Sequence, residues 1–343
     1  MERQKRIESW LEGLFPGRPH TLAPASADAS FRRYFRVSFA DGETRIVMDA
    51  PPSHEDVKPW LHVQECFAAA DVHVPAVEAR DLEQGFLLLS DLGNDTYLSA
   101  LTPDNAVELY RDAFDALVRI QAASRPGQLP AYDRALLKRE LDLFPDWYVT
   151  KHLGVDLDDK QRAQLETVFE RIIAANLAEA QVYVHRDYHS RNLMLVPGGN
   201  PGIIDFQDAV YGPVSYDAVS LLKDAYIDWD EELVLDWLVR YWERARKAGV
   251  PVPEDFGDFY RNYEWMGVQR HIKVLGIFAR LYHRDGKDGY LKDMPLVAKY
   301  LRRACERYGE LGPLRQLLDK LEDKITVLGY TMNREGLGAR REE

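Results

Sequence analysis

The sequence predicts an α+β fold in two lobes, a small α/β lobe over residues 1–90 and a larger, mainly helical lobe over residues 91–343. Three observations support this division. Most β-like runs lie before residue 90, and hydrophobic residues recur at helical spacing over much of the chain after it. One β-like island, over residues 182–205, interrupts the helical patterns. A chain of 343 residues is also long enough for one large or two ordinary domains.

The elements of the small lobe follow from local patterns. Apolar residues at helical spacing predict an opening helix, with one face formed by Ile7, Trp10, Leu11 and Leu14. The dipeptide Asp41-Gly42 separates two β-like runs and is typical of a hairpin turn. The expected strands of this hairpin cover residues 33–39 and 44–48. The remaining expected elements are a helix over 57–70 and strands over 74–77 and 85–89.

The larger lobe is predicted from helical periodicity. Thr102-Pro103 places a capping residue before a proline, which is favoured at the first helical position, so we expect a helix to begin there. Apolar faces over residues 107–118 and 165–173 indicate two helices, and helical patterns continue from about residue 216 to residue 318.

Composition limits the partners and the compartment. The chain carries 44 Lys and Arg against 56 Asp and Glu, a net charge of -12, which on average repels nucleic acid and anionic membranes. We therefore expect neither as a partner. Cys66 and Cys305 form no paired framework, and no run approaches the roughly 18 apolar residues of a membrane-spanning helix. A cytoplasmic location is expected, and the oligomeric state is left open.

The most specific motif is His185-Arg186-Asp187 followed by Asn192, which matches the pattern H-R-D-x-x-x-x-N. In phosphoryl transfer, an aspartate at this position accepts or orients the proton of the attacking hydroxyl, and the asparagine reaches a Mg²⁺ ion on the nucleotide phosphates. The pattern predicts Asp187 as the catalytic residue and Asn192 as a metal ligand. A zinc site at His185 and His189 is disfavoured, because Arg186 stands where zinc proteases carry a glutamate.

Several stretches around this motif carry a resemblance to a known group of enzymes. They are residues 28–37, 47–52, 184–194 and 204–209, with Gly212-Pro213 and Tyr216-Asp217 after them. In these stretches the chain resembles the aminoglycoside phosphotransferase and choline kinase group, which has a protein-kinase-like bilobal fold. Within that group it is most similar to the bacterial anomeric sugar kinases of cell-wall recycling.

The resemblance implies an ATP- and Mg²⁺-dependent kinase. Its acceptor would be the anomeric hydroxyl of N-acetylmuramate or N-acetylglucosamine, and its product the sugar 1-phosphate of peptidoglycan recycling. The resemblance also implies that Asp205, thirteen positions after Asn192, is the second metal ligand, since hard cations prefer oxygen ligands. Two alternatives stay open: a kinase for an aminoglycoside or choline, and a nucleotide-binding scaffold without catalysis.

The nucleotide side departs from the protein-kinase pattern. The first loop lacks G-x-G-x-x-G, and Met48-Asp49 stands where a phosphate-binding lysine is expected, so an acidic side chain there would repel phosphate. A cation is expected instead from Arg32 or Arg33, because arginine can bind phosphate through two hydrogen bonds. The expected nucleotide-binding residues are Ser30, Phe31, Arg32, Arg33, Ser90 and Leu92.

The acceptor side is predicted to take a small molecule. Only twelve positions separate Asp205 from Asp217, too few for the long segment on which protein kinases dock peptides. Asp217 is expected to accept hydrogen bonds from the catalytic loop, and His185 to brace that loop. Asp208 either contacts the acceptor or caps a turn, and Arg191 is assigned to the carboxylate of a muramyl sugar. The expected substrate-binding residues are His189, Arg191, Gln207 and Asp208.

Overall fold

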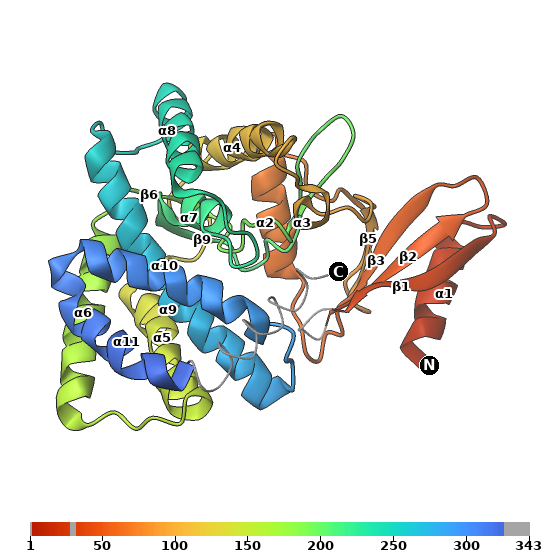
Figure 1. Ribbon diagram of the computed structural model, residues 1–343. Coiled ribbons are helices and arrows are strands. Elements are labelled where there is room, and N and C mark those ends of the chain that lie inside the picture. The colour runs from red at the N-terminus through yellow and green to blue at the C-terminus, as the bar shows by residue number, and fades with distance from the viewer. Residues whose placement is uncertain (1, 28–31, 326–343) are drawn as a thin grey trace, which may run out of the picture. The chain divides into compact units, whose positions relative to one another are not determined.

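The computed structural model describes residues 2–27 and 32–325 and divides the chain into two compact units (Figure 1). The sheet unit contains the described residues up to Ile120 together with Arg191–Asp208. The helical unit contains Gln121–Ser190 and the described residues from Ala209 onward. An antiparallel sheet in the first unit and a mainly helical second unit confirm the α+β class. The predicted lobes, 1–90 and 91–343, have other bounds than these units and stay a prediction.

The sheet unit is built on five antiparallel strands in the order β1-β2-β3-β5-β4. Their bounds are β1 His20–Ala27, β2 Arg33–Phe39, β3 Thr44–Asp49, β4 Val77–Asp81 and β5 Phe86–Ser90. The β2–β3 hairpin agrees with the predicted one. The sequence did not indicate β1, whose pairing with β2 shifts between Pro24 and Ser26. The strand expected at 74–77 lies further on, at β4, because Pro75 has no backbone N–H to donate to a neighbouring strand.

The two faces of this sheet have different neighbours. Alternate residues of a strand point to opposite faces. Phe35 and Val37 of β2 pack with Ile7 and Leu11 of α1 (Glu2–Leu14) in one hydrophobic core, which confirms the amphipathic opening helix. Figure 1 shows α1 beside the strands of this sheet. The opposite face therefore carries the intervening residues of each strand, and it is this face that lines a pocket.

Three helices and a short hairpin complete the sheet unit, although the last two residues of the third helix belong to the helical unit. The elements are α2 Lys58–Ala68, α3 Tyr97–Ala100, α4 Ala106–Ala122 and the hairpin of β7 Leu193–Met194 with β8 Gly202–Ile203. The helix expected to begin at Thr102-Pro103 begins instead at Ala106. The Asn105 side chain accepts from the Thr102 N–H at 2.8 Å and donates to the Ala100 carbonyl at 2.8 Å, which holds residues 100–105 in a turn.

The helical unit is organised around α9 (Phe256–Asp285), a 30-residue helix whose middle is almost entirely buried. The elements around it are α5 Arg134–Leu141, the π-helix η1 Phe144–His152, α6 Asp159–Leu177, α7 Tyr216–Leu222, α8 Glu231–Lys247, η2 Leu291–Asp293, α10 Met294–Arg307, η3 Gly309–Leu311 and α11 Gly312–Ile325. Strands β6 (Gln181–Val184) and β9 (Val210–Pro213) form a separate pair. Gly276 lets α9 approach the chain before η1, because a Cβ there would lie 2.5 Å from the Leu143 Cβ.

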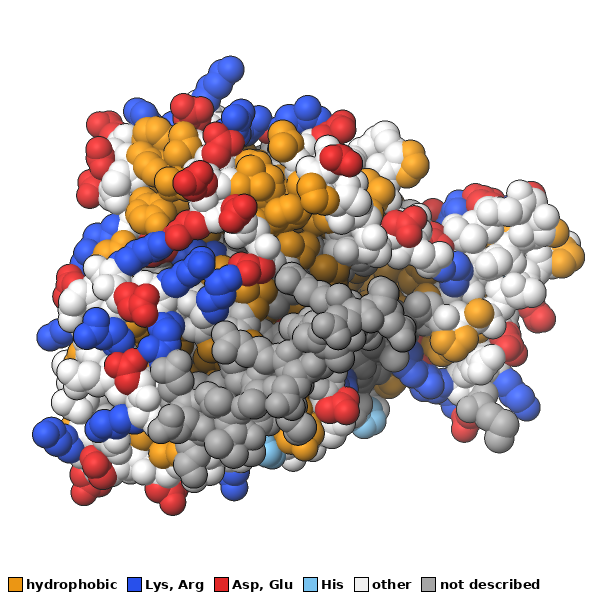
Figure 2. Space-filling model, viewed as in Figure 1, with side chains coloured by type: hydrophobic (Ala, Val, Ile, Leu, Met, Phe, Trp, Pro, Cys, Tyr) orange, Lys and Arg blue, Asp and Glu red, His pale blue; other side chains and the backbone are white. Residues whose placement is uncertain are grey.

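The charged side chains lie mostly at the surface. On the face shown in Figure 2, Lys and Arg side chains are interspersed with Asp and Glu. Within the described residues, no helix is both long and apolar enough to span a membrane.

Candidate active site

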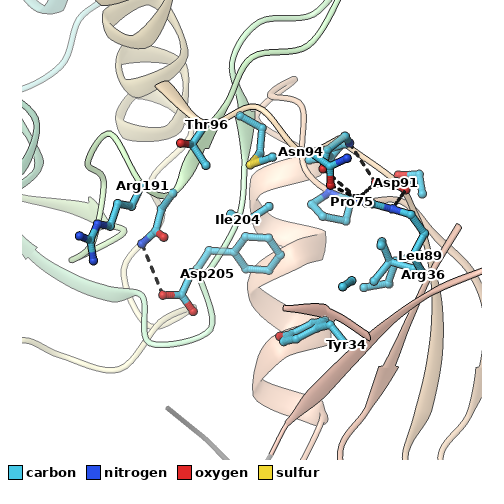
Figure 3. Close-up of a pocket in the computed structure, with 18 of the residues that line it drawn as sticks. Tyr34, Arg36, Pro75, Leu89, Asp91, Asn94, Thr96, Arg191, Ile204 and Asp205 are labelled. Atoms are coloured by element: carbon cyan, nitrogen blue, oxygen red, sulfur yellow. Dashed lines mark hydrogen bonds and ion pairs between the residues drawn. The ribbon is translucent and has the colours of Figure 1, made fainter. Parts of the chain in front are cut away.

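The sheet unit holds a pocket of about 400 Å³, which Figure 3 shows in close-up. Its walls come from the sheet face opposite α1, from the segment after β5 and from the β7–β8 hairpin. The predicted residues Ser90 and Leu92 line it, as do Arg191, Asn192 and Asp205. The volume falls within the range of small-molecule sites, about 300–1,000 Å³.

One end of the pocket is an apolar slot. Ile46 and Leu89 lie on its sheet side. Leu92 packs with Met194 and Ile204 on the other. Gly202 of β8 permits this packing, because a Cβ there would lie 2.9 Å from the Leu92 side chain. Such a slot suits a flat ring system.

The pocket's rim beside this slot carries an arginine that the sequence analysis did not single out. Arg36 of β2 lies on the pocket face, and its Nε and Nη2 donate to the two Asp91 carboxylate oxygens at 2.5 and 3.0 Å (Figure 3). Burial alone would raise the pKa of Asp91, but Arg36 and the Gly93 N–H outweigh it and lower that pKa. The alternation along β2 was the signal that could have found Arg36, since it places Arg36 opposite Phe35 and Val37.

Asp49 does not lie where it could repel a phosphate group, contrary to the expectation from the sequence. It belongs to the sheet face that packs on α1, and its carboxylate is fully buried. Arg3 of α1 donates to it at 2.9 Å and Arg33 at 3.1 Å. Met48, paired across the strands with Tyr34, and Ile46, paired with Arg36, belong to the opposite face of β3, and Ile46 lines the pocket. The expected repulsion is therefore wrong, because Asp49 points away from the pocket and is neutralised.

The phosphate-binding role predicted for the first loop stays a prediction. Ser30 and Phe31 lie outside the described residues. The structure pairs Arg33 with Asp49, on the sheet face that packs on α1. Arg32 directly precedes β2 and is partly exposed.

Asn192 and Asp205 come together at the other end of the pocket. The Asn192 Nδ2 lies 3.4 Å from the Asp205 Oδ2, and the Ile204 N–H donates to the Asn192 carbonyl at 3.1 Å (Figure 3). Asp205 has a φ of 63°, a left-handed conformation that is uncommon without glycine and often marks functional positions. The next residue, Phe206, is fully buried with its ring 5.0 Å from that of Trp60 in α2, which anchors this turn.

The donor set at this end fits a divalent metal ion. An amide oxygen and a carboxylate are hard oxygen ligands, and Mg²⁺ commonly takes one or two such protein ligands together with substrate phosphates. Gln207, predicted to bind substrate, donates to the Asp205 Oδ1 at 2.8 Å and so orients the carboxylate. Asp208 is exposed on the same turn. The substrate roles of Gln207 and Asp208 stay predictions.

The catalytic loop lies in the helical unit, directly after β6. Asp217, buried in the first turn of α7, accepts from the His185 N–H at 2.7 Å and from the Arg186 N–H at 3.0 Å. The His185 Nδ1 accepts from the Asp187 N–H at 3.3 Å. Both predicted structural roles are confirmed. Arg186 has a φ of 76°, the second left-handed residue in the motif region, and these bonds hold it there.

Asp187 is surrounded by positive charge. Its carboxylate lies 3.8 Å from the Arg270 guanidinium of α9. Burial alone would raise the pKa of Asp187, but Lys273, Arg270 and His189 outweigh it and hold the pKa well below the ordinary value. Asp187 is therefore ionised at any physiological pH. An ionised carboxylate can accept a hydrogen bond from a hydroxyl and orient it, and it is a weak base.

The cations near Asp187 belong to a buried ion network that the sequence analysis missed. Arg186 pairs with Glu140 of α5, and the Lys273 Nζ lies 3.3 Å from the same carboxylate. The Arg270 Nη1 donates to the Arg186 carbonyl at 2.8 Å. No local pattern marks Glu140 or the arginine and lysine of α9, which are distant in sequence from the loop that they hold.

His189 and Ser190 end the catalytic loop against the segment after α7. The Ser190 N–H donates to Asp224 at 3.0 Å, and the His189 ring lies 5.5 Å from that of Tyr226. The structure thus places His189 in the helical unit, whereas Arg191, Gln207 and Asp208 belong to the sheet unit.

Comparison with known proteins identifies the family. The model of the phosphotransferase enzyme family matches residues 21–250, more than half of the chain. The chain belongs to the phosphotransferase enzyme family. This phosphotransferase is 51% identical over 336 residues to a protein of Neisseria meningitidis serogroup B, with 96% of this chain and 100% of that protein covered. It is 49% identical to a protein of Pseudomonas aeruginosa, with 93% and 97% covered. Both relatives are named N-acetylmuramate/N-acetylglucosamine kinase.

Solved structures confirm the kinase-like fold. A choline kinase from Streptococcus pneumoniae matches with a TM-score of 0.63 at 12% identity, with 88% of this chain and 99% of that chain covered. An ADP-bound aminoglycoside phosphotransferase matches with a TM-score of 0.58 at 16% identity, with 86% and 96% covered. Membership of this family implies the use of ATP and a divalent metal ion by this phosphotransferase.

Proposed function

We propose that this phosphotransferase uses ATP and Mg²⁺ to phosphorylate the anomeric hydroxyl of N-acetylmuramate and N-acetylglucosamine. The product is the sugar 1-phosphate, and the reaction serves peptidoglycan recycling in the cytoplasm. One observation carries the proposal. About half of the residues are identical to those of two relatives named N-acetylmuramate/N-acetylglucosamine kinase, over nearly the full length of both chains.

The residues have complementary parts in this proposal. The apolar slot beside Ser90 and Leu92 takes the adenine, and Asn192 and Asp205 hold the metal ion. The bound ion neutralises the phosphate charge. Asp187 orients the sugar hydroxyl. Its low pKa suits this part, because phosphoryl transfer passes through a loose transition state that asks mainly for positioning, and an anomeric hydroxyl is more acidic than an ordinary alcohol.

The acceptor residues are proposed from the sequence. His189, Arg191, Gln207 and Asp208 contact the sugar, with Arg191 on the muramyl carboxylate. Arg191 lines the pocket in the sheet unit, and Figure 3 shows it beside Thr96 and Asp205 rather than beside Arg36.

An acceptor panel tests the proposal. ADP release is measured with N-acetylmuramate, N-acetylglucosamine, choline and an aminoglycoside, and phosphorus NMR locates the phosphate in the product. We expect transfer to the two amino sugars at C1. Transfer only to choline or an aminoglycoside would support the other kinase classes, and no ADP release with any acceptor would support a scaffold.

The Asp187→Asn variant supplies the catalytic control. It keeps the size of the side chain and removes its charge, so turnover should fall at least a hundredfold while ATP binding is retained. Turnover within about tenfold of the parent would show that Asp187 has another role.

A further inference from the structure

The helical unit contains a second pocket, of about 330 Å³, that includes no residue of the catalytic loop. This volume is at the lower end of the range of small-molecule sites, about 300–1,000 Å³. Helices α8, α9 and α10 line it, and α8 contributes mainly aliphatic side chains. Helices α9 and α10 contribute side chains that recur at spacings of three, four or seven residues, so they lie on one face of each helix. They are Tyr260, Tyr263 and Glu264 on α9 and Tyr300, Arg303 and Arg307 on α10.

The charges in this pocket leave one cation in excess. Lys223 pairs with Glu264. Arg307 donates to the Glu264 Oε2 at 2.9 Å and also pairs with Glu231. Two cations thus face two carboxylates. Arg303 also lines the pocket, and within the described part of the chain no carboxylate pairs with it. The pocket therefore offers one guanidinium to an anionic group.

Aromatic rings form much of the remaining wall. Tyr260 and Tyr263 contribute from α9, Tyr300 from α10 and Trp229 from the segment after α7. Aromatic faces pack on apolar ring surfaces, and their hydroxyl or N–H groups can bind polar substituents. A small ring with one anionic substituent matches these walls and the Arg303 guanidinium. A sugar that carries a carboxylate or a phosphate has this chemistry, and the choice of a sugar rests on the proposed function.

The pocket is connected to the catalytic loop through one short segment. Lys223 and Trp229 line the pocket. Between them, Asp224 accepts from the Ser190 N–H and Tyr226 packs against His189. A ligand that orders residues 223–229 would therefore also act on the end of the catalytic loop. We propose that this pocket is a second binding site, for a small anionic sugar, and that its occupancy changes turnover.

Calorimetry without ATP tests the site directly. The full-length protein is titrated with N-acetylmuramate, with N-acetylglucosamine 1-phosphate and, as a neutral control, with N-acetylglucosamine. We expect the number of binding sites per chain to be one higher for at least one anionic sugar than for the neutral sugar. Comparison of the two anionic sugars shows whether the additional site binds a carboxylate or a phosphate. Arg303→Gln should weaken the additional binding about tenfold or more and leave the neutral sugar unaffected.

A matched variant and a kinetic measurement complete the test. Arg302→Gln changes the neighbouring arginine of α10, which pairs with Asp319 of α11 at 2.6 Å, and should keep the additional site. Added N-acetylglucosamine 1-phosphate should change kcat for N-acetylglucosamine in the parent and not in Arg303→Gln.

Equal numbers of sites for neutral and anionic sugars, or an additional site that Arg303→Gln leaves intact, would overturn the proposal. An unchanged kcat in the parent would overturn its coupling to the catalytic loop. Failure of the proposed function has another signature, namely no phosphate transfer to either amino sugar, because the binding measurements need no turnover.

Discussion

Replacing Asp217 with asparagine tests how the catalytic loop is held. The buried carboxylate accepts the His185 N–H through one oxygen and the Arg186 N–H through the other, at 2.7 and 3.0 Å. An asparagine of the same shape has one acceptor oxygen. Whichever way its amide turns, one backbone N–H of the loop then faces an NH₂ group and loses its acceptor.

The expected loss in free energy of unfolding follows from this missing acceptor. A buried donor without an acceptor costs about 1–3 kcal/mol. The amide also removes the cost of burying a charge, which offsets the weaker hydrogen bond that remains. We therefore expect the free energy of unfolding to fall by about 1–3 kcal/mol, out of the 5–15 kcal/mol typical of a folded domain. Arg186, held at a φ of 76°, is then freer to leave this conformation, so turnover should fall as well.

Urea unfolding followed by circular dichroism, with a kinase assay in parallel, measures both effects. Burial raises the pKa of Asp217 to about 7, so the measurement is made at pH 8, where the parent carboxylate is mostly ionised. Asp236→Asn, which breaks an exposed pair with Arg240 four residues further along α8, is the matched control and should cost under about 0.5 kcal/mol. An Asp217→Asn variant with the stability and turnover of that control would refute the reasoning.

Three further predictions concern the pocket, a buried carboxyl and a close approach of two segments. Arg36→Met leaves Asp91 without its cation and should raise the KM for ATP about tenfold with little change in kcat; an unchanged KM would place Arg36 outside nucleotide binding. Burial raises the pKa of Glu179 from 4.5 to about 8, so the folded protein keeps a proton that the unfolded chain releases. Unfolding free energy should therefore fall as pH rises from 4.5 to about 8, and Glu179→Gln should abolish that fall, whereas parallel curves for the two proteins would contradict the assignment. Gly276→Ala should lower Tm, because the new methyl lies 2.5 Å from the Leu143 Cβ; an equal Tm would show that η1 can move away.

Several elements were predictable because their signals are local. The opening helix carries its apolar residues at helical spacing, and the β2–β3 hairpin has Asp-Gly at its turn. Other elements depended on contacts with other residues of the chain. β1 has a proline and small residues, and it becomes a strand by pairing with β2. The start of α4 at Ala106 depended on the Asn105 side chain, which stabilises a turn where a helix cap was expected.

Phosphoryl-transfer chemistry was predictable from the amino-acid sequence. Asp187 and Asn192 stand five positions apart in one loop, and Asp205 follows one hairpin later, so the whole motif lies in one short stretch of the sequence. Which of the charged side chains face the pocket, in contrast, depends on how the sheet pairs and packs. Asp49 and Arg36 lie on adjacent strands, yet Asp49 points to α1 and Arg36 to the pocket. Adjacent residues of a strand point to opposite faces, and which face is covered by a helix depends on how the whole sheet pairs and packs.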